Sequence, residues 1–328
     1  MQAIVFTRYG PPDYLELKEV EKPAPKDNET LVQVVAAATN PLDWHIMRAA
    51  PFFVRLDTGL RKPKMNRLGV DIAGRVAAVG SSVTEFQPGD EVFGGVNFGG
   101  FAEYAVGTEK SLVHKPAGIS FEGAASTPVV GFTAIQGLRD TGNIQTGEKI
   151  LVNGASGGVG TFAVQYAKSV GAEVTGVCST RNLDLVRSIG ADHVIDYTQE
   201  DFTRTGQQYD LIYDAVGNRT AAAYRRALSP DGRCVVAGFT TLRQMILQVM
   251  LLGSLITRAS SKTIGSMGTA QTQKADLLLI KDLLESGKVV PVIDRSYPLS
   301  ETAEAIRYLE TGRARGKVMV NVTEAAQA

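Results

Sequence analysis

Cysteine is scarce in this sequence, and neither sign of charge is in excess. The chain has 2 cysteines in 328 residues, Cys178 and Cys234, and both lie in runs that predict buried strands. Such a pair predicts neither a disulfide framework nor a cysteine-rich metal site. The 34 basic and 34 acidic residues cancel, so the overall charge does not favour nucleic acid as a partner. We therefore expect a small-molecule substrate.

Long hydrophobic runs and a targeting segment are missing as well. The longest apolar stretch, residues 245–256, is interrupted by Gln248 and Gly253 and is shorter than the roughly 20 residues of a membrane-spanning helix. The chain begins directly with the alternation of a strand, without the layout of a signal peptide. We expect a cytoplasmic protein without a membrane partner. The apolar segment 242–256 is interpreted as a cover for the substrate pocket or as part of a subunit contact.

The stretch from 149 to 168, KILVNGASGGVGTFAVQYAK, is the most informative part of the sequence. An apolar strand breaks into a turn of small residues and reopens as an amphipathic helix. Small residues let backbone N–H groups and the positive end of a helix approach a pyrophosphate closely. Ala155 stands where the first glycine of the usual dinucleotide fingerprint would be, so a purely structural turn is the alternative. The predicted cofactor contacts in this turn are Ser156, Gly157, Gly158 and Val159.

Two kinds of pattern follow one another along the chain. Residues 1 to about 123 predict short strands and loops, typical of a β-rich, barrel-like unit. Strands then alternate with helices, which predicts βαβ units and a parallel sheet. Gly171, Gly190 and Gly232 are expected to end helices there. The last elements are expected to return to the first domain. The predicted α/β protein therefore has a catalytic domain of residues 1–123 and 268–328 and a cofactor-binding domain of residues 124–267.

Several motifs occur in order along the chain. They are N-P-L-D-W at 40–44, L-G-x-D-x-A-G-x-V-x-x-V-G at 68–80, F-x-P-G-D-x-V-F-G at 86–94, G-x-F-A-E-Y at 99–104, G-A-S-G-G-V-G at 154–160, S-x-G-A-D-x-V-I-D-Y at 188–197 and G-K-V-V-P-V-I-D at 287–294. Through these motifs nearly the whole chain resembles a zinc-free member of the medium-chain dehydrogenase/reductase superfamily, in its quinone oxidoreductase and zeta-crystallin-like branch.

The resemblance implies a fold, an activity and an assembly. The fold would be a GroES-like catalytic domain made from both chain ends, with a Rossmann domain, a doubly wound parallel sheet, inserted between them and an active-site cleft where the two meet. The activity would be reduction of quinones, enones or enals with NADPH. Relatives usually pair their Rossmann sheets edge to edge, which implies a homodimer with residues 262–267 as the edge strand. Fold analogy does not by itself establish chemistry, which depends on the residues of the site.

The residues after the second parallel strand favour NADPH over NADH. Enzymes that prefer NAD usually place an acidic residue about 20 positions after the glycine turn. Cys178 occupies this place, followed by Ser179, Thr180 and Arg181, whose hydroxyls and guanidinium can bind a 2'-phosphate. Tyr197 resembles the tyrosine that related reductases place beside the adenosine phosphate. The alternatives are a solvated helix residue for Arg181 and a strand-end aromatic for Tyr197.

Further cofactor contacts are predicted from the ends of other elements. Thr133 opens a helix and resembles a residue that contacts nicotinamide in relatives; an ordinary helix hydroxyl is the alternative. Two loops follow the fourth and fifth strands at their carboxyl ends, where doubly wound sheets bind ligands; ordinary turns are the alternative. The predicted contacts in these loops are Val216, Gly217, Gly238, Phe239 and Thr240.

No metal site is expected, and this shapes the predicted chemistry. Zinc-dependent relatives have a His-Glu pair where this chain has Val70 and Asp71, and the strand cysteines cannot supply the remaining ligands. Without a Lewis acid, hydride must reach an already electrophilic carbon, and a donor must stabilise the charge that develops on oxygen. His45 and Asn40 are the predicted catalytic residues. A packed histidine and a turn-capping asparagine are the alternatives.

Two other functions stay open from the sequence alone. An enoyl-thioester reductase would need a basic channel for a carrier phosphate. The basic residues that support it are Arg55, Arg61, Lys62, Lys64 and Arg67. A non-catalytic NADPH-binding protein is the alternative from a different class.

Overall fold

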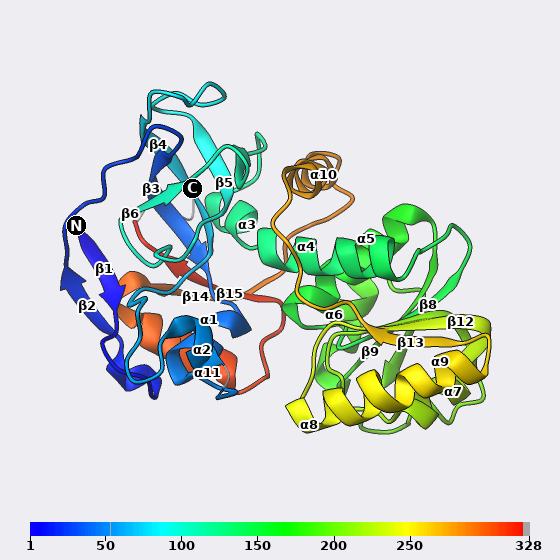
Figure 1. Ribbon diagram of the computed structural model, residues 1–328. Coiled ribbons are helices and arrows are strands. Elements are labelled where there is room, and N and C mark those ends of the chain that lie inside the picture. The colour runs from blue at the N-terminus through cyan, green and yellow to red at the C-terminus, as the bar shows by residue number, and fades with distance from the viewer. Residues whose placement is uncertain (53, 324–328) are drawn as a thin grey trace. The chain divides into compact units, whose positions relative to one another are not determined.

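The computed structural model describes residues 1–52 and 54–323. The chain forms two compact units, whose elements are labelled in Figure 1. The first unit comprises Met1–Val129, Thr272–Gly287 and Pro291–Ala328, and the second comprises Val130–Gln271 and Lys288–Val290. The short return to the second unit is held by Gln165, whose side chain donates to the Val290 oxygen at 3.0 Å and accepts from the Val290 nitrogen at 2.8 Å.

The first unit is built on a seven-stranded sheet with the order β14-β15-β3-β4-β5-β7, in which β6 also pairs with β3. Neighbouring strands are antiparallel except for β14 and β15, which are parallel. β1 and β2 form a separate antiparallel pair. The strands are β1 (Gln2–Val5), β2 (Glu16–Glu19), β3 (Thr30–Ala38), β4 (Asp71–Val79), β5 (Glu91–Gly95), β6 (Tyr104–Gly107), β7 (Leu112–His114), β14 (Ile293–Pro298) and β15 (Lys317–Asn321). The helices are η1 (Pro12–Tyr14), α1 (Pro41–Arg48), α2 (Val54–Thr58), α3 (Phe121–Ala125), α10 (Lys274–Glu285), η5 (Leu299–Glu301) and α11 (Thr302–Glu310), and α4 (Pro128–Ile135) crosses the unit boundary.

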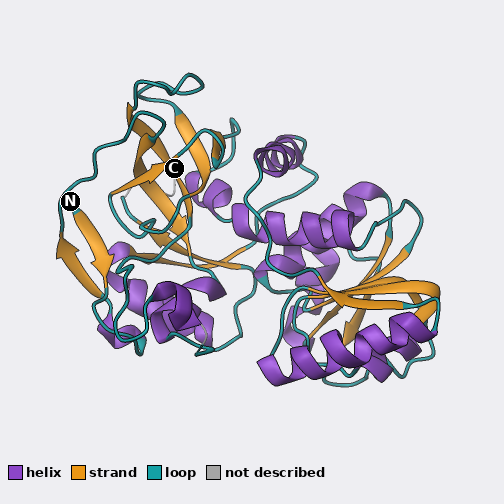
Figure 2. Ribbon diagram, in the orientation of Figure 1, coloured by secondary structure: helices purple, strands orange, loops and turns teal. Residues whose placement is uncertain are grey.

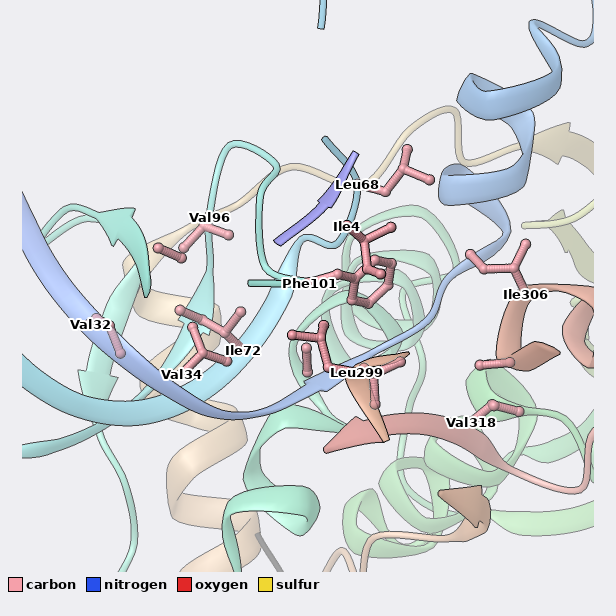
Figure 3. Packing of buried hydrophobic residues seen from close by; sticks show 14 of the residues in the cluster. Ile4, Val32, Val34, Leu68, Ile72, Val96, Phe101, Leu299, Ile306 and Val318 are labelled. Atoms are coloured by element: carbon pink, nitrogen blue, oxygen red, sulfur yellow. The ribbon is translucent and has the colours of Figure 1, made fainter. Parts of the chain in front are cut away.

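The core of the first unit lies around β3. Its sequence, TLVQVVAAA, is buried at every position except Gln33, so both faces of the strand are covered by other parts of the unit. Figure 3 shows how side chains from both chain ends meet in this core. The labelled residues include Ile4, Val32, Ile72, Ile306 and Val318. Burial of these apolar side chains explains why the C-terminal strand β15 completes a sheet begun near the N-terminus.

The second unit is built on a six-stranded parallel sheet with the order β10-β9-β8-β11-β12-β13. Its strands are β8 (Lys149–Asn153), β9 (Glu173–Cys178), β10 (His193–Asp196), β11 (Tyr209–Asp214), β12 (Leu228–Val236) and β13 (Thr263–Ser266). Its helices are η2 (Gln136–Thr141), α5 (Gly158–Val170), η3 (Thr180–Asn182), α6 (Leu183–Ser188), α7 (Ala221–Ala227), α8 (Leu242–Gln244), η4 (Met245–Gly253) and α9 (Ser254–Ala259). Figure 2 shows helices on both faces of this sheet. The strand order reverses between β8 and β11, which makes their carboxyl ends a topological switch point. The expected α/β fold, with a β-rich part and a doubly wound parallel sheet, is confirmed.

Two of the three helix ends predicted from glycines are confirmed. Gly171 and Gly190 have φ angles of 90° and 103°, the left-handed conformation that ends a helix. The prediction for Gly232 was wrong. The helix α7 already ends at Ala227, and Leu228 continues in extended conformation into β12. The residue with positive φ in that strand is Asp231, at 62°.

Candidate active site

The phosphate turn joins β8 to α5 in the second unit. The turn is pinned to β9, because Gly154 N and Ala155 N both donate to Val177 O, at 3.1 and 3.0 Å. Gly157 precedes the first residue of α5 in extended conformation, with φ −84° and ψ 172°. The positive end of this thirteen-residue helix therefore faces the turn.

Glycines in the turn serve two different purposes. A Cβ on Gly160 would lie 2.0 Å from Gly154 O, so this glycine allows the helix to pack against the turn. A Cβ on Gly157 would meet nothing closer than Gly154 O, at 3.6 Å, so this position opens onto free space. A pyrophosphate needs such an open, side-chain-free backbone. The turn fits the cofactor that the sequence predicts.

A hydrogen bond that the sequence reasoning missed orients the predicted contact Ser156. The Asn182 amide donates to Ser156 Oγ at 2.9 Å and to Ser179 Oγ at 3.3 Å. Asn182 is buried, so it ties the phosphate turn to the residues after β9. Because Ser156 Oγ accepts this bond, its own hydroxyl hydrogen can serve an anion.

The rim predicted for the adenosine phosphate carries a carboxylate, Asp196, that was not among the residues predicted from the sequence. Thr180 and Arg181 lie in η3, directly after β9, and both are exposed. Thr180 Oγ1 donates to Asp196 Oδ2 at 2.5 Å. Tyr197, 54% exposed, follows Asp196, and its backbone nitrogen donates to Cys178 O. The strand β9 ends in Cys178 without an acidic residue, but Asp196 at the end of the neighbouring strand β10 brings a negative charge to the same rim.

The two predicted loops after β11 and β12 are organised by Asp214, another residue that the sequence reasoning missed. This fully buried carboxylate ends β11. Oδ1 accepts from Val216 N and Gly217 N, both at 2.7 Å, and from the Asn153 amide at 3.0 Å, while Oδ2 accepts from the Tyr224 hydroxyl at 2.7 Å. Burial, together with the Asp214 charge, raises the pKa of Tyr224. Tyr224 therefore acts here as a neutral donor.

The two loops also touch each other. A Cβ on Gly217 would lie 2.2 Å from Gly238 O, and Gly217 has a φ of 64°, so both space and conformation require glycine there. Thr240 Oγ1 donates to Val216 O at 3.2 Å. Phe239, next to Gly238, is partly exposed. Since Asn153, Asp214 and Val236 end neighbouring strands in register, these loops and the phosphate turn lie along one edge of the sheet.

Thr133 is half-buried in α4. Its backbone oxygen accepts a hydrogen bond from the hydroxyl of Tyr213, a residue of β11, at 3.0 Å. The contact fixes the start of the second unit to the strand that carries Asp214. A nicotinamide contact by Thr133 stays a prediction.

Asn40, one of the two predicted catalytic residues, lies in a buried polar cluster of the first unit. It is 1% exposed. Its amide nitrogen donates to Asp71 Oδ2 at 2.9 Å and to Ala38 O at 3.3 Å, and its oxygen accepts from Lys317 Nζ at 2.7 Å. Both amide hydrogens are therefore used within the protein. The structure therefore shows Asn40 as part of a buried hydrogen-bond network, and its predicted catalytic role stays a prediction.

Two buried carboxylates and one buried ammonium make up the rest of this cluster. Lys317 Nζ also donates to Thr39 O at 3.0 Å and lies 3.5 Å from Asp71 Oδ2. Asp43 accepts from Asn40 N at 2.7 Å and from Gly69 N at 2.8 Å. Burial raises the pKa of Asp43 to about 7 and raises that of Asp71, and it lowers the pKa of Lys317. We call these four residues, Asn40, Asp43, Asp71 and Lys317, the buried cluster.

His45, the other predicted catalytic residue, lies in the middle of α1 and is half-buried. Its ring stacks on Trp44, with the ring centroids 3.7 Å apart. Nδ1 lies 2.6 Å from Ala50 O. A carbonyl oxygen can only accept, so Nδ1 carries a hydrogen, and Nε2 is the ring nitrogen left for a ligand.

Neither a metal centre nor a membrane span is found in the described part of the chain. Across residues 1–52 and 54–323, no three His, Cys, Asp or Glu side chains come close enough together to hold a metal ion. Within the same residues no helix has both the length and the apolar character to cross a membrane.

Both parts of the chain match known protein families. Residues 26–117 match the alcohol dehydrogenase GroES-like domain, and residues 189–320 match the family described as zinc-binding dehydrogenase. Among solved structures, the quinone oxidoreductase from Coxiella burnetii is 29% identical with a TM-score of 0.85, covering 98% of this chain and 99% of that one. The Escherichia coli quinone oxidoreductase complexed with NADPH is 26% identical with a TM-score of 0.82, covering 98% of this chain and 100% of that one.

Curated relatives extend the match over almost the whole chain. The 2-methylene-furan-3-one reductase of Solanum lycopersicum is 36% identical over 98% of this chain and 79% of that protein. The chloroplastic NADPH-dependent alkenal/one oxidoreductase of Arabidopsis thaliana is likewise 36% identical over 98% of this chain and 79% of that protein. The name of this relative places it in the chloroplast, and a cytoplasmic location of the present chain stays a prediction. The chain belongs to the medium-chain dehydrogenase/reductase superfamily, in its quinone oxidoreductase and alkenal reductase branch of NAD(P)H oxidoreductases.

Proposed function

We propose that this protein reduces quinones or α,β-unsaturated carbonyl compounds, enals and enones, with NADPH. The observation that carries the proposal is the phosphate turn, in which Gly157 leaves open backbone at the positive end of α5. The names of the relatives, among them an alkenal/one oxidoreductase and a quinone oxidoreductase complexed with NADPH, support the substrate class and the cofactor.

The second unit offers a separate group for each part of the dinucleotide. Backbone of the phosphate turn and the Ser156 hydroxyl would hold the pyrophosphate, and Ser179 and Arg181 would hold the 2'-phosphate. The loops arranged by Asp214 would hold the nicotinamide half. When bound, NADPH supplies a hydride from its nicotinamide ring.

The proposal is tested by following NADPH oxidation with a panel of quinones, enals, enones and enoyl thioesters, with NADH in parallel. Turnover of quinones, enals or enones with NADPH is the expected result. Measurable NADPH binding without turnover of any compound would instead indicate a non-catalytic NADPH-binding protein.

An enoyl-thioester reductase is the second candidate, because a group of cations in the first unit has no acidic partner among the residues that the structure describes. Arg61, Lys62 and Lys64 are exposed, Arg67 is half-buried, and none of the four forms an ion pair within the described residues. Such cations could receive the phosphates of an acyl carrier. Preferential turnover of enoyl thioesters in the panel would favour this function over the first.

We propose that His45 supplies the proton that completes reduction. The hydrogen on Nδ1 is donated to Ala50 O, so Nε2 is the nitrogen that can give up a proton. After that loss the neutral ring keeps its hydrogen bond to Ala50 O unchanged. The variant His45→Gln keeps a hydrogen-bond donor but cannot give up a proton. We expect kcat to fall by about 100-fold, measured with a good quinone or enal substrate. The control is His114→Gln, because His114 is exposed, with its Nε2 at 3.2 Å from Glu85 O and its ring in a T-shaped contact with Phe86; an equal loss in both variants would contradict the role of His45.

We also propose that the protein is a homodimer joined at β13. This strand ends the parallel sheet, as predicted for residues 262–267, so its outer edge lacks a partner strand within the described chain. The neighbouring helical segment η4–α9 exposes large apolar side chains, among them Leu251 at 56%. We expect Leu251→Glu to weaken the dimer at least tenfold in sedimentation equilibrium. Leu278→Glu, at a 43% exposed site of α10, is the control and should stay dimeric. An unchanged mass with a raised KM would instead identify the segment as a cover of the substrate pocket.

A further inference from the structure

Asp196 is placed by the sheet beside the residues that follow β9. β9 and β10 are parallel, and Asp196 pairs with Cys178, the last residue of β9. Thr180 Oγ1 donates to Asp196 Oδ2 at 2.5 Å. The other carboxylate oxygen accepts from Thr198, through its nitrogen at 2.9 Å and its hydroxyl at 2.8 Å. The carboxylate thus joins the turn after β9 to the turn after β10.

These hydrogen bonds keep Asp196 negatively charged. They lower the pKa of its carboxyl, the bond from Thr180 contributing most. A carboxylate only accepts, so the single hydroxyl hydrogen of Thr180 is directed at Asp196 and away from any anion at the rim. Thr180 was predicted to donate to a 2'-phosphate, and in this arrangement it presents only lone pairs.

A carboxylate beside η3 has a consequence for cofactor choice. NAD-preferring enzymes carry an acidic residue at the end of the second strand, where it binds the ribose 2'-hydroxyl and repels a 2'-phosphate. Here the second strand ends in Cys178, and the acidic residue stands one strand further along, in register with it. Arg181 in η3 and Asp196 therefore act on the same region with opposite charge.

We propose that Asp196 is a specificity-determining residue that weakens the hold on the 2'-phosphate of NADPH and so keeps NADH usable. The inference rests on the proposed function, because the 2'-phosphate subsite at residues 179–181 is part of it. The effect is electrostatic and acts on the additional phosphate alone. Repulsion between one carboxylate and a phosphate dianion several ångströms away in water-like surroundings corresponds to about a five- to tenfold change in affinity.

The test measures dissociation constants of NADPH and NADH by cofactor fluorescence at low and high ionic strength. We expect Asp196→Asn to bind NADPH about five- to tenfold more tightly than the unaltered protein, with NADH changed less than twofold. High salt should reduce the gain, because exposed charges are screened. Glu173→Gln removes an exposed carboxylate at the opposite end of β9 and should change neither constant.

Two more variants separate charge from positioning and from the subsite itself. Thr180→Val keeps the Asp196 charge, so the ratio of the two constants should stay within twofold of the original. An unchanged or lowered NADPH preference in Asp196→Asn would overturn the proposal, as would an equal shift in Thr180→Val. Arg181→Ala should weaken NADPH more than NADH; equal losses would refute the 2'-phosphate subsite, and no binding of either cofactor by the unaltered protein would refute the proposed function.

Discussion

Replacing Lys317 by methionine is expected to destabilise the first unit by about 3–5 kcal/mol, because it leaves a buried carboxylate without its cation. Lys317 is 5% exposed and Asp71 is fully buried, and the ammonium also holds the Asn40 amide and Thr39 O. Urea unfolding followed by fluorescence measures the effect. The only tryptophan of the chain, Trp44, lies in α1 next to Asp43, so the signal reports this unit.

Two controls define what the loss means. Lys281→Met removes a surface cation 3.6 Å from Glu285 on α10 and should cost at most about 0.5 kcal/mol. The double variant Asp71→Asn with Lys317→Met removes both charges and should regain part of the stability. A Lys317→Met variant as stable as the Lys281→Met control would show that the buried cluster carries no net ionic pairing.

The same unfolding measurement has an expected dependence on pH. Burial raises the pKa of Asp43 from 3.8 to about 7, so between these values the folded state binds more protons than the unfolded state. The contribution of this carboxyl to the free energy of unfolding therefore falls as the pH rises from 3.8 to about 7, by up to about 1.4 kcal/mol per pH unit. Without Lys317, which lowers the pKa of Asp43, the decline should extend to higher pH.

Local patterns in the sequence were sufficient to predict a β-rich part, a parallel sheet and the glycine turn between β8 and α5. The turn at 154–160 is set by glycines whose role depends on residues a few positions away, such as Gly160 against Gly154. Helix ends at Gly171 and Gly190 are local for the same reason. At Gly232 the local rule failed, because an extended segment separates this glycine from the end of α7.

The polar residues that organise the site could not be predicted, because they depend on pairing between distant segments. Asp196 reaches Thr180 only through the register of β10 with β9, and Asp214 reaches the Asn153 amide only through the register of β11 with β8. Lys317 lies far along the chain from Asn40 and meets it through the pairing of β15 with β3. A sequence motif shows which residues are present, but the register between strands determines which of them come within hydrogen-bond distance.

Gly160→Ala and Gly157→Ala are expected to impair cofactor binding for different reasons. In Gly160→Ala the new methyl group would lie 2.0 Å from Gly154 O, so the turn must shift. We expect a loss of about 1–3 kcal/mol in stability of the second unit and at least a tenfold loss of NADPH affinity. Hydrogen exchange at β8 and α5 measures the first effect and cofactor fluorescence the second.

Gly157→Ala tests whether a ligand approaches the turn at all. Its methyl group would enter space that the protein leaves open, with a backbone conformation that alanine adopts readily, so hydrogen exchange at β8 and α5 should be unchanged. A pyrophosphate against the same backbone would meet that methyl group, and we expect NADPH affinity to fall about tenfold. Gly118→Ala would also add a methyl group to open space, but it does not serve as a control. Gly118 has a φ of 81°, and alanine is strained in that backbone conformation. Within the protein the added methyl group of Gly157→Ala contacts no atom that would have to move, so only a bound ligand can be affected by it. Unchanged NADPH affinity in this variant would therefore mean that the open side of the turn does not face the cofactor.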